Sequence, residues 1–168
     1  MSFSQQPRVG IYNEPETGIQ LPEIIGVYHR GNVTPYEFEP GKTGVAIQYR
    51  STDAEVTIYV RALGQEHAKT ASDFLNESLA AVKDMEERGK YSNVKIYTVD
   101  PKKERPGWSS GAFTSKSSNR FLISYILCKI VPGHLVKIRA STGNPNNEPL
   151  QSFIGSTQEI VDNTSKKS

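Results

Sequence analysis

Gly41-Lys42-Thr43 is the segment closest to a known chemical motif, because it matches the end of a phosphate-binding loop. That motif has a further glycine five residues before its last one, and this sequence has Tyr36 there. The motif must also lead into a helix whose N-terminus faces the phosphate, whereas residues 45–50 alternate apolar and polar side chains as a strand does. We therefore interpret residues 41–43 as a turn.

Side chains that could hold a metal ion or act as a nucleophile are few. His29, His67 and His134 have no His, Cys or Asp at the spacing of a metal site. Ser109-Ser110-Gly111 lacks the strand-turn-helix setting of a serine nucleophile. The single cysteine, Cys128, lies in an apolar segment, which favours a buried structural thiol. We predict no catalytic residue, no metal and no cofactor, and hence no enzyme.

Charge is the one unevenly distributed property of the chain. The net charge is only +2, but residues 1–89 carry 8 Lys and Arg against 13 Asp and Glu, and residues 90–168 carry 12 against 5. A basic face built from the second half would attract an acidic protein or another polyanion.

Six residues are candidates for contact with such a partner: Lys102, Lys103, Arg105, Trp108, Lys116 and Arg120. An exposed Trp beside an Arg is typical of an interface anchor. The alternative is that the cations are ordinary solvated residues and that Trp108 belongs to the core. We do not expect binding of nucleic acid, because no recognisable nucleic-acid module is present.

The elements that position these residues follow from the periodicity. Alternation predicts one hairpin over residues 45–60 and another over residues 120–140, where Pro132-Gly133 fits a type II turn. Further strands are predicted over residues 27–38, 94–99 and 108–116.

Two helices are predicted by apolar residues that recur every three or four positions, at about 71–88 and 148–163. Thr70 or Ser72 can cap the first helix, and Gly89 suits its end.

This order of elements predicts an α+β fold, with two helices packed on an antiparallel sheet of about six to seven strands. A length of 168 residues fits one domain, and we expect residues 1–18 and 164–168 to be loosely ordered ends. No segment reaches the roughly 20 apolar residues of a membrane span.

Several segments resemble the opening of a poorly characterised bacterial family: Leu21-Pro22-Glu23-Ile24-Ile25-Gly26, Tyr36-Glu37, Gly44-Val45-Ala46-Ile47-Gln48-Tyr49-Arg50 and Thr57-Ile58-Tyr59-Val60. The order of elements also resembles the PsbP-like fold, which is shared by an extrinsic subunit of photosystem II and a nuclear-import factor that binds a small GTPase. The resemblance implies a non-enzymatic adaptor for another macromolecule. It carries no functional residue over to this chain.

Our leading hypothesis is therefore a binding or accessory module for another protein. The alternative is a small-ligand carrier or modest enzyme with a pocket between sheet and helices, into which Tyr59, Tyr125 or His134 would point. A third possibility is a structural subunit that forms a homo-oligomer. We expect a cytoplasmic location for the chain as written, or a periplasmic one if an export signal has been removed.

Overall fold

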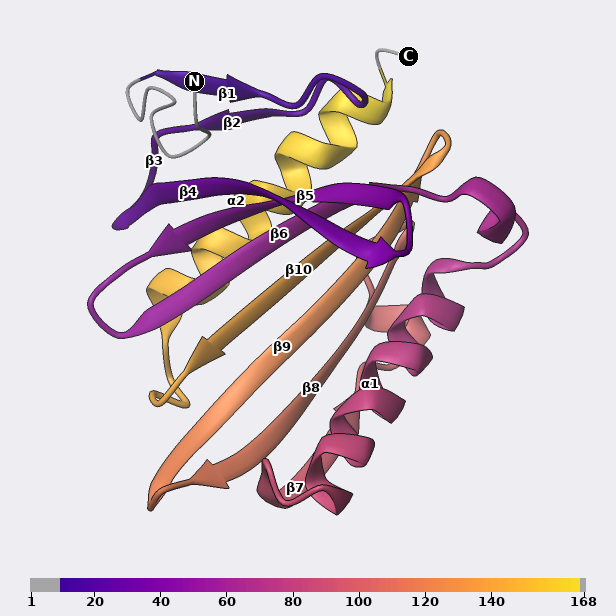
Figure 1. Ribbon diagram of the computed structural model, residues 1–168. Coiled ribbons are helices and arrows are strands. Elements are labelled where there is room, and N and C mark those ends of the chain that lie inside the picture. Colours follow the sequence, from indigo (N-terminus) through magenta and orange to yellow (C-terminus); the bar gives the residue numbers. More distant parts are fainter. Residues whose placement is uncertain (1–9, 167–168) are drawn as a thin grey trace.

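A computed structural model describes residues 10–166 of the chain as an α+β fold (Figure 1). Within this range eight strands form one antiparallel sheet in the order β3-β4-β5-β6-β10-β9-β8-β7. These strands are β3 (Ile24–Ile25), β4 (Tyr28–Glu39), β5 (Lys42–Arg50), β6 (Ala54–Ala62), β7 (Ser92–Thr98), β8 (Trp108–Ser117), β9 (Arg120–Val131) and β10 (His134–Thr142). A separate hairpin pairs β1 (Ile11–Asn13) with β2 (Gln20–Pro22).

The predicted fold class is confirmed, and the differences lie at the two ends of the chain. The large sheet has one strand more than the six to seven expected, because β3 adds two residues to its edge. Residues 1–9 lie outside the described residues, but β1 occupies part of the segment 1–18 that we expected to be loosely ordered. The buried carboxylate of Glu14 accepts hydrogen bonds from the N–H groups of Glu16 and Thr17 and so fixes the β1–β2 turn.

Helix α1 (Ala71–Glu87) begins at the predicted residue and ends one residue before the predicted end. The Thr70 hydroxyl accepts a hydrogen bond from the N–H of Asp73, and the Asp73 carboxylate accepts one from the N–H of Thr70. This capping box satisfies two N–H groups that the helix itself cannot pair. Gly89 follows the helix at φ +78°, a conformation that favours glycine.

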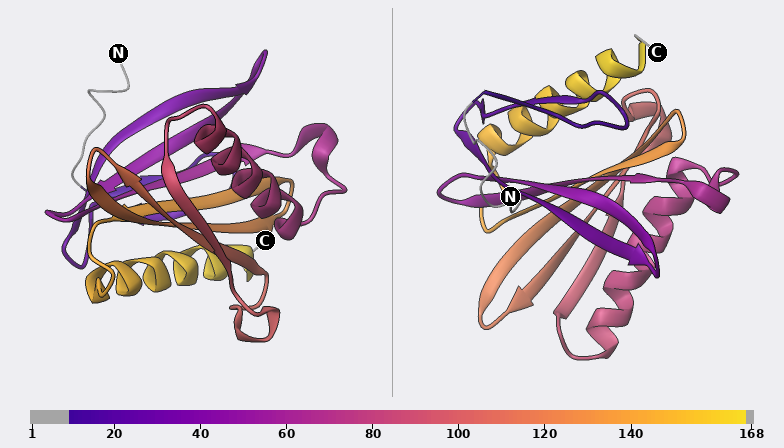
Figure 2. Two further views of the ribbon diagram at one scale, coloured as in Figure 1. Left: turned by 90° about the horizontal axis from the view of Figure 1, so that it is seen from below. Right: turned by 45° about the horizontal axis from the view of Figure 1, so that its top comes forward.

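Helix α2 (Glu148–Lys166) lies on the opposite face of the sheet from α1 (Figure 2, left). Asn147 precedes it and is buried, with its side-chain oxygen accepting from the N–H of Leu150 and its amide donating to Thr142. The helix extends to Lys166, three residues beyond the predicted end, and residues 167–168 are not described. Neither α1 nor α2 combines the length and apolar character that crossing a membrane requires.

The sheet separates two hydrophobic cores, because successive side chains of a strand point to opposite faces. Leu127, Val136 and Ile138 belong to the core beneath α2, which also includes residues of the β1–β2 hairpin. Their neighbours Ile126 and Leu135 belong to the core beneath α1. On this second face α1 packs against β7, β8 and β9, so it leaves part of the sheet uncovered.

Candidate functional site

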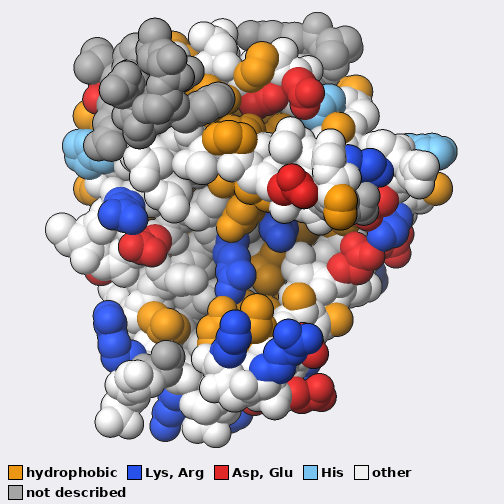
Figure 3. All heavy atoms as spheres, in the orientation of Figure 1, with side chains coloured by type: hydrophobic (Ala, Val, Ile, Leu, Met, Phe, Trp, Pro, Cys, Tyr) orange, Lys and Arg blue, Asp and Glu red, His pale blue; other side chains and the backbone are white. Residues whose placement is uncertain are grey.

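A cavity of about 400 Å³ lies between α1 and the part of the sheet that α1 leaves uncovered. Figure 3 shows this face, where hydrophobic, Lys and Arg side chains gather in a central hollow. Helix α1 lines the cavity with side chains spaced three or four residues apart, from Phe74 to Met85. Strands β4, β6 and β10 line it from the other sides, and Tyr91 after α1 completes the wall. The residues that line the cavity therefore come from segments that are far apart in the sequence, from Tyr36 to Arg139.

The cavity side of β10 carries Leu135, Lys137 and Arg139, because Val136 and Ile138 point into the core on the other face. Lys137 lies opposite Tyr59 on β6 in the strand register, and its Nζ is 5.0 Å from the centre of the Tyr59 ring. Alternation along each strand selects these side chains, and antiparallel pairing brings them together.

Tyr36 forms part of the cavity wall because the residue opposite it on β5 is Gly44. A Cβ atom on Gly44 would lie 2.8 Å from Cε1 of Tyr36 and 2.7 Å from the carbonyl oxygen of Val60. Glycine therefore lets the Tyr36 ring pack down on the sheet, where it meets the Tyr59 ring edge-on at 5.3 Å between centres. Burial raises the pKa of Tyr36 to about 12, so this phenol is neutral at physiological pH.

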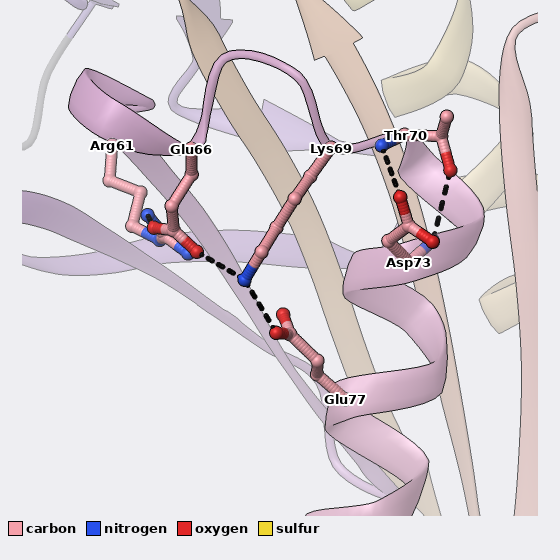
Figure 4. Close-up of polar contacts among 6 residues, drawn as sticks. All are labelled: Arg61, Glu66, Lys69, Thr70, Asp73 and Glu77. Carbon is pink, nitrogen blue, oxygen red and sulfur yellow. Dashed lines mark hydrogen bonds and ion pairs between the residues drawn. The ribbon is translucent and has the colours of Figure 1, made fainter.

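At the rim of the cavity, four charged side chains form an alternating chain (Figure 4). Glu66 lies 2.8 Å from Arg61 and 2.9 Å from Lys69, and Lys69 lies 2.6 Å from Glu77. The Arg61 guanidinium also lies 4.4 Å from the centre of the Phe38 ring. Among the described side chains that line the cavity, Glu77 is the one carboxylate, and it is thus paired at the rim.

Lys137 and Arg139 differ from Arg61, since neither has a carboxylate partner among the side chains that the structure describes. Arg139 donates a 3.0 Å hydrogen bond to the Tyr91 hydroxyl, which is a neutral group. Burial lowers the pKa of Lys137, and the charges of Arg139 and Arg61 lower it further. The cavity thus contains two half-buried cations, Lys137 and Arg139, which are adjacent on one face of β10. None of the described carboxylates neutralises them.

The six residues predicted to contact a partner do not form one face. Lys116 and Arg120 lie at the turn of the β8–β9 hairpin, and Trp108 lies eight residues away along β8, or about 26 Å at 3.3 Å per residue. Lys102 and Lys103 are exposed in the loop before β8. The six candidate residues are therefore divided between two ends of the sheet.

Trp108 is a core residue, which was the alternative reading of the sequence. Its side chain is 3% exposed, and its indole N–H donates to Asp162 of α2 at 2.9 Å. Arg105 and Lys129 form ion pairs with the same carboxylate. Burial alone would raise the pKa of Asp162, but the hydrogen bonds from these three side chains outweigh it and lower the pKa. Trp108 and Arg105 therefore fix α2 to the sheet, and an exposed interface Trp is not present here.

The three side chains expected to point into a pocket have different surroundings. Tyr59 lines the cavity beneath α1. Tyr125 lines a second cavity of about 390 Å³, which lies between α2 and strands β7, β8 and β9. Lys103 and Arg105 also line this second cavity. His134 lies 3.0 Å from Glu16 and links β10 to the β1–β2 turn.

The other chemical motifs have structural explanations. Gly41 has φ +77° and lies in the turn between β4 and β5. Ser110 donates from its N–H and its hydroxyl to Glu104 and anchors the preceding loop. Burial raises the pKa of the Cys128 thiol to about 12. Within residues 10–166 no group of three or more His, Cys, Asp or Glu side chains is arranged to hold a metal ion.

Comparison with known proteins does not assign this chain to a family. No protein-family model matches the chain, and no curated protein matches it.

Proposed function

We propose that this protein binds a small anionic ligand, a carboxylate or phosphate attached to an apolar or aromatic body, in the cavity beneath α1. The observation that carries the proposal is the pair Lys137 and Arg139, which line this cavity without a carboxylate partner among the described side chains. Removing two cations from water is costly unless an opposite charge compensates them. An anion bound between them would supply that charge.

The surroundings of the two cations favour a ligand with a flat or apolar body. Tyr36, Tyr59 and Phe38 lie on the sheet side of the cavity, and Met85 lies on the helix side. Aromatic faces pack well against flat groups, and a partly desolvated site strengthens the attraction between ligand and cation. A volume of about 400 Å³ lies within the range of small-molecule sites, which is about 300–1,000 Å³.

Calorimetric titration with phenylacetate and phenyl phosphate tests the proposal, with phenylacetamide as a neutral analogue of similar size. We expect the two anions to bind and the amide to bind at least about tenfold more weakly, since a hydrogen bond to a charged group contributes about 1.5–3 kcal/mol. The variants Lys137→Met and Arg139→Gln should each weaken anion binding by about 10–100-fold.

The matched control is Lys103→Gln, which removes an exposed cation outside this cavity and should leave anion binding unchanged. Equal affinity for phenylacetate and phenylacetamide, or equal loss in the control and cavity variants, would contradict the proposal. A folded wild-type protein that binds neither anion would contradict it as well.

Binding of another protein, our leading hypothesis from the sequence, is a second candidate function, and the basic residues favour an acidic partner. The observation that favours it is that Lys103 and Arg105 line the second cavity, between α2 and strands β7, β8 and β9. Arg105 is unsuitable for charge reversal because its pairing with Asp162 is structural.

The double variant Lys102→Glu/Lys103→Glu is the sharper test of this second function. Its control is Lys116→Glu/Arg120→Glu, which makes the same change of charge at the far end of the hairpin. We expect the first double variant alone to weaken the affinity for an acidic partner captured from the native organism. Unchanged affinity would exclude the loop before β8 as the contact.

A further inference from the structure

Lys137 has the surroundings of a reactive amine. It lies in the middle of β10, with Tyr59 opposite on one neighbouring strand and Cys128 opposite on the other. Its side chain is half-buried and lines the cavity beneath α1. No carboxylate among the described side chains pairs with its ammonium group, whereas the rim cations Arg61 and Lys69 both have acidic partners.

These surroundings increase the fraction of Lys137 that is present as the unprotonated amine, which is the nucleophilic form of lysine. Burial disfavours the ammonium ion, and the positive charges of Arg139 and Arg61 act in the same direction, so the pKa of Lys137 is lowered. A Cys128 thiolate would oppose this effect, but the pKa of that thiol is raised to about 12, so the group is neutral at physiological pH. Desolvation together with a neighbouring cation is an established way in which proteins activate a lysine amine.

Arg139 can hold a carboxylate next to this amine. It lies two residues from Lys137 on the same face of β10, so their Cα atoms are about 7 Å apart. One of its terminal nitrogens donates to Tyr91, and the planar guanidinium has further N–H groups that can bind a carboxylate. If Arg139 binds the carboxylate of a ligand, a carbonyl group adjacent to that carboxylate lies in the part of the cavity that Lys137 also lines.

We infer that Lys137 forms a reversible imine with a small 2-oxo acid whose carboxylate is bound by Arg139. The amine nitrogen adds to the carbonyl carbon, and the resulting carbinolamine loses the former carbonyl oxygen as water, which leaves a C=N bond. No oxidant or reductant is consumed, and addition of water restores the free amine and the oxo acid. This inference rests on the proposed function, because it requires the cavity to admit an anion.

Reductive trapping tests the imine directly. The full chain is incubated with phenylpyruvate and cyanoborohydride, which reduces an imine to a stable secondary amine, and the modified lysines are located by peptide mass spectrometry. We expect modification of Lys137 to exceed that of the exposed Lys102 and Lys103 by about tenfold or more, because the charged contact with Arg139 holds the oxo acid beside the Lys137 amine. Phenylacetate, which has the carboxylate but no ketone, should compete and slow the trapping.

Two variants test the separate roles of the Lys137 amine and the Arg139 guanidinium. Lys137→Arg keeps the positive charge but has no primary amine, so the selective modification should disappear while the circular dichroism spectrum is retained. Arg139→Gln keeps the amine and should reduce trapping at Lys137 by about tenfold, because the carboxylate contact is lost.

Phenylacetate binding without selective trapping would overturn the imine and leave the proposed function standing. Trapping at Lys137 that neither phenylacetate nor Arg139→Gln reduces would overturn the carboxylate site, and with it this inference. Equal modification of Lys102, Lys103 and Lys137 would overturn the inference as well.

Discussion

Replacement of Asp162 by asparagine tests how firmly α2 is fixed to the sheet. Its carboxylate accepts hydrogen bonds from Trp108, Arg105 and Lys129. The side chains of Asp162 and Lys129 are 16% and 14% exposed, so water screens their ion pair only in part. Asp162→Asn leaves the Lys129 charge without its counter-charge. We expect a loss of about 3 kcal/mol in the free energy of unfolding, the low end of the range for a buried pair, because some exposure remains.

Urea unfolding followed by fluorescence measures this loss, since Trp108 is the only tryptophan and is buried. For a chain of this length the same change lowers the melting temperature by about 6–12 °C. The control is Asp84→Asn in α1, whose partner Arg88 is 68% exposed and whose own side chain is 54% exposed. Because solvent screens that pair, we expect the control to change stability by less than about 0.5 kcal/mol.

The effect of Asp162→Asn should also depend on pH in a definite direction. The pKa of Asp162 is lowered in the folded state, so the ionised carboxylate stabilises the fold above its unfolded pKa of about 4. This contribution is lost as the pH falls through the folded-state pKa. The difference between variant and wild type should therefore be large at pH 7 and shrink below about pH 4. A difference under about 0.5 kcal/mol at pH 7, or one that persists undiminished in acid, would refute the reasoning.

Further predictions concern glycine, capping and thiol chemistry. Gly44→Ala should lower the free energy of unfolding by about 1–3 kcal/mol, because its Cβ would collide with Tyr36 and the backbone, whereas Gly155→Ala in open space on α2 should raise it by about 0.5–1 kcal/mol. Urea unfolding of both variants checks the two signs, and the reverse order would contradict the packing argument. Thr70→Ala should cost about 1 kcal/mol in the same assay, and Ser72→Ala less than about 0.5, since Thr70 provides the cap. Iodoacetamide at pH 8 should modify Cys128 only after the protein unfolds. The raised pKa of the buried thiol leaves about a thousandfold less thiolate than an exposed cysteine has. Rapid labelling of the folded protein would contradict this prediction, because it would show that the thiol is accessible.

The helices and hairpins were predictable because their signals are local. Thr70 and Gly89 lie within two residues of the ends of α1, and Gly133 lies in the turn between β9 and β10. Periodicity within a short window was therefore enough to place α1 and the hairpins. Strand β1 was missed because it has three residues and depends on the turn that Glu14 closes.

The cavity was not predictable in the same way, because it depends on contacts between segments distant in sequence. Tyr59 was expected to point into a pocket, but its position opposite Lys137 follows from the pairing of β6 with β10. The sequence indicated only that Lys137 and Arg139 belong to the basic second half of the chain, and it did not place them in a cavity. The surroundings of Trp108 depend on Asp162, which is 54 residues away. An alternating pattern shows which residues share a strand face, but only the register shows which strands lie side by side.

The two cores on opposite faces of one sheet have a consequence for how the molecule opens. Strands β9 and β10 supply alternate side chains to both cores, so loosening one face removes the support behind the other. Separation of these strands should coincide with global unfolding, and their backbone amides should exchange with solvent more slowly than those of β3 or the β1–β2 hairpin. The walls of the cavity should then differ in local stability. Lys137 and Arg139 lie on β10, which we expect to separate from its neighbours only on global unfolding, whereas Tyr36 lies on β4, toward the edge of the sheet. A ligand would thus meet cations held on a stable strand and a Tyr36 ring on a strand that can adjust to it.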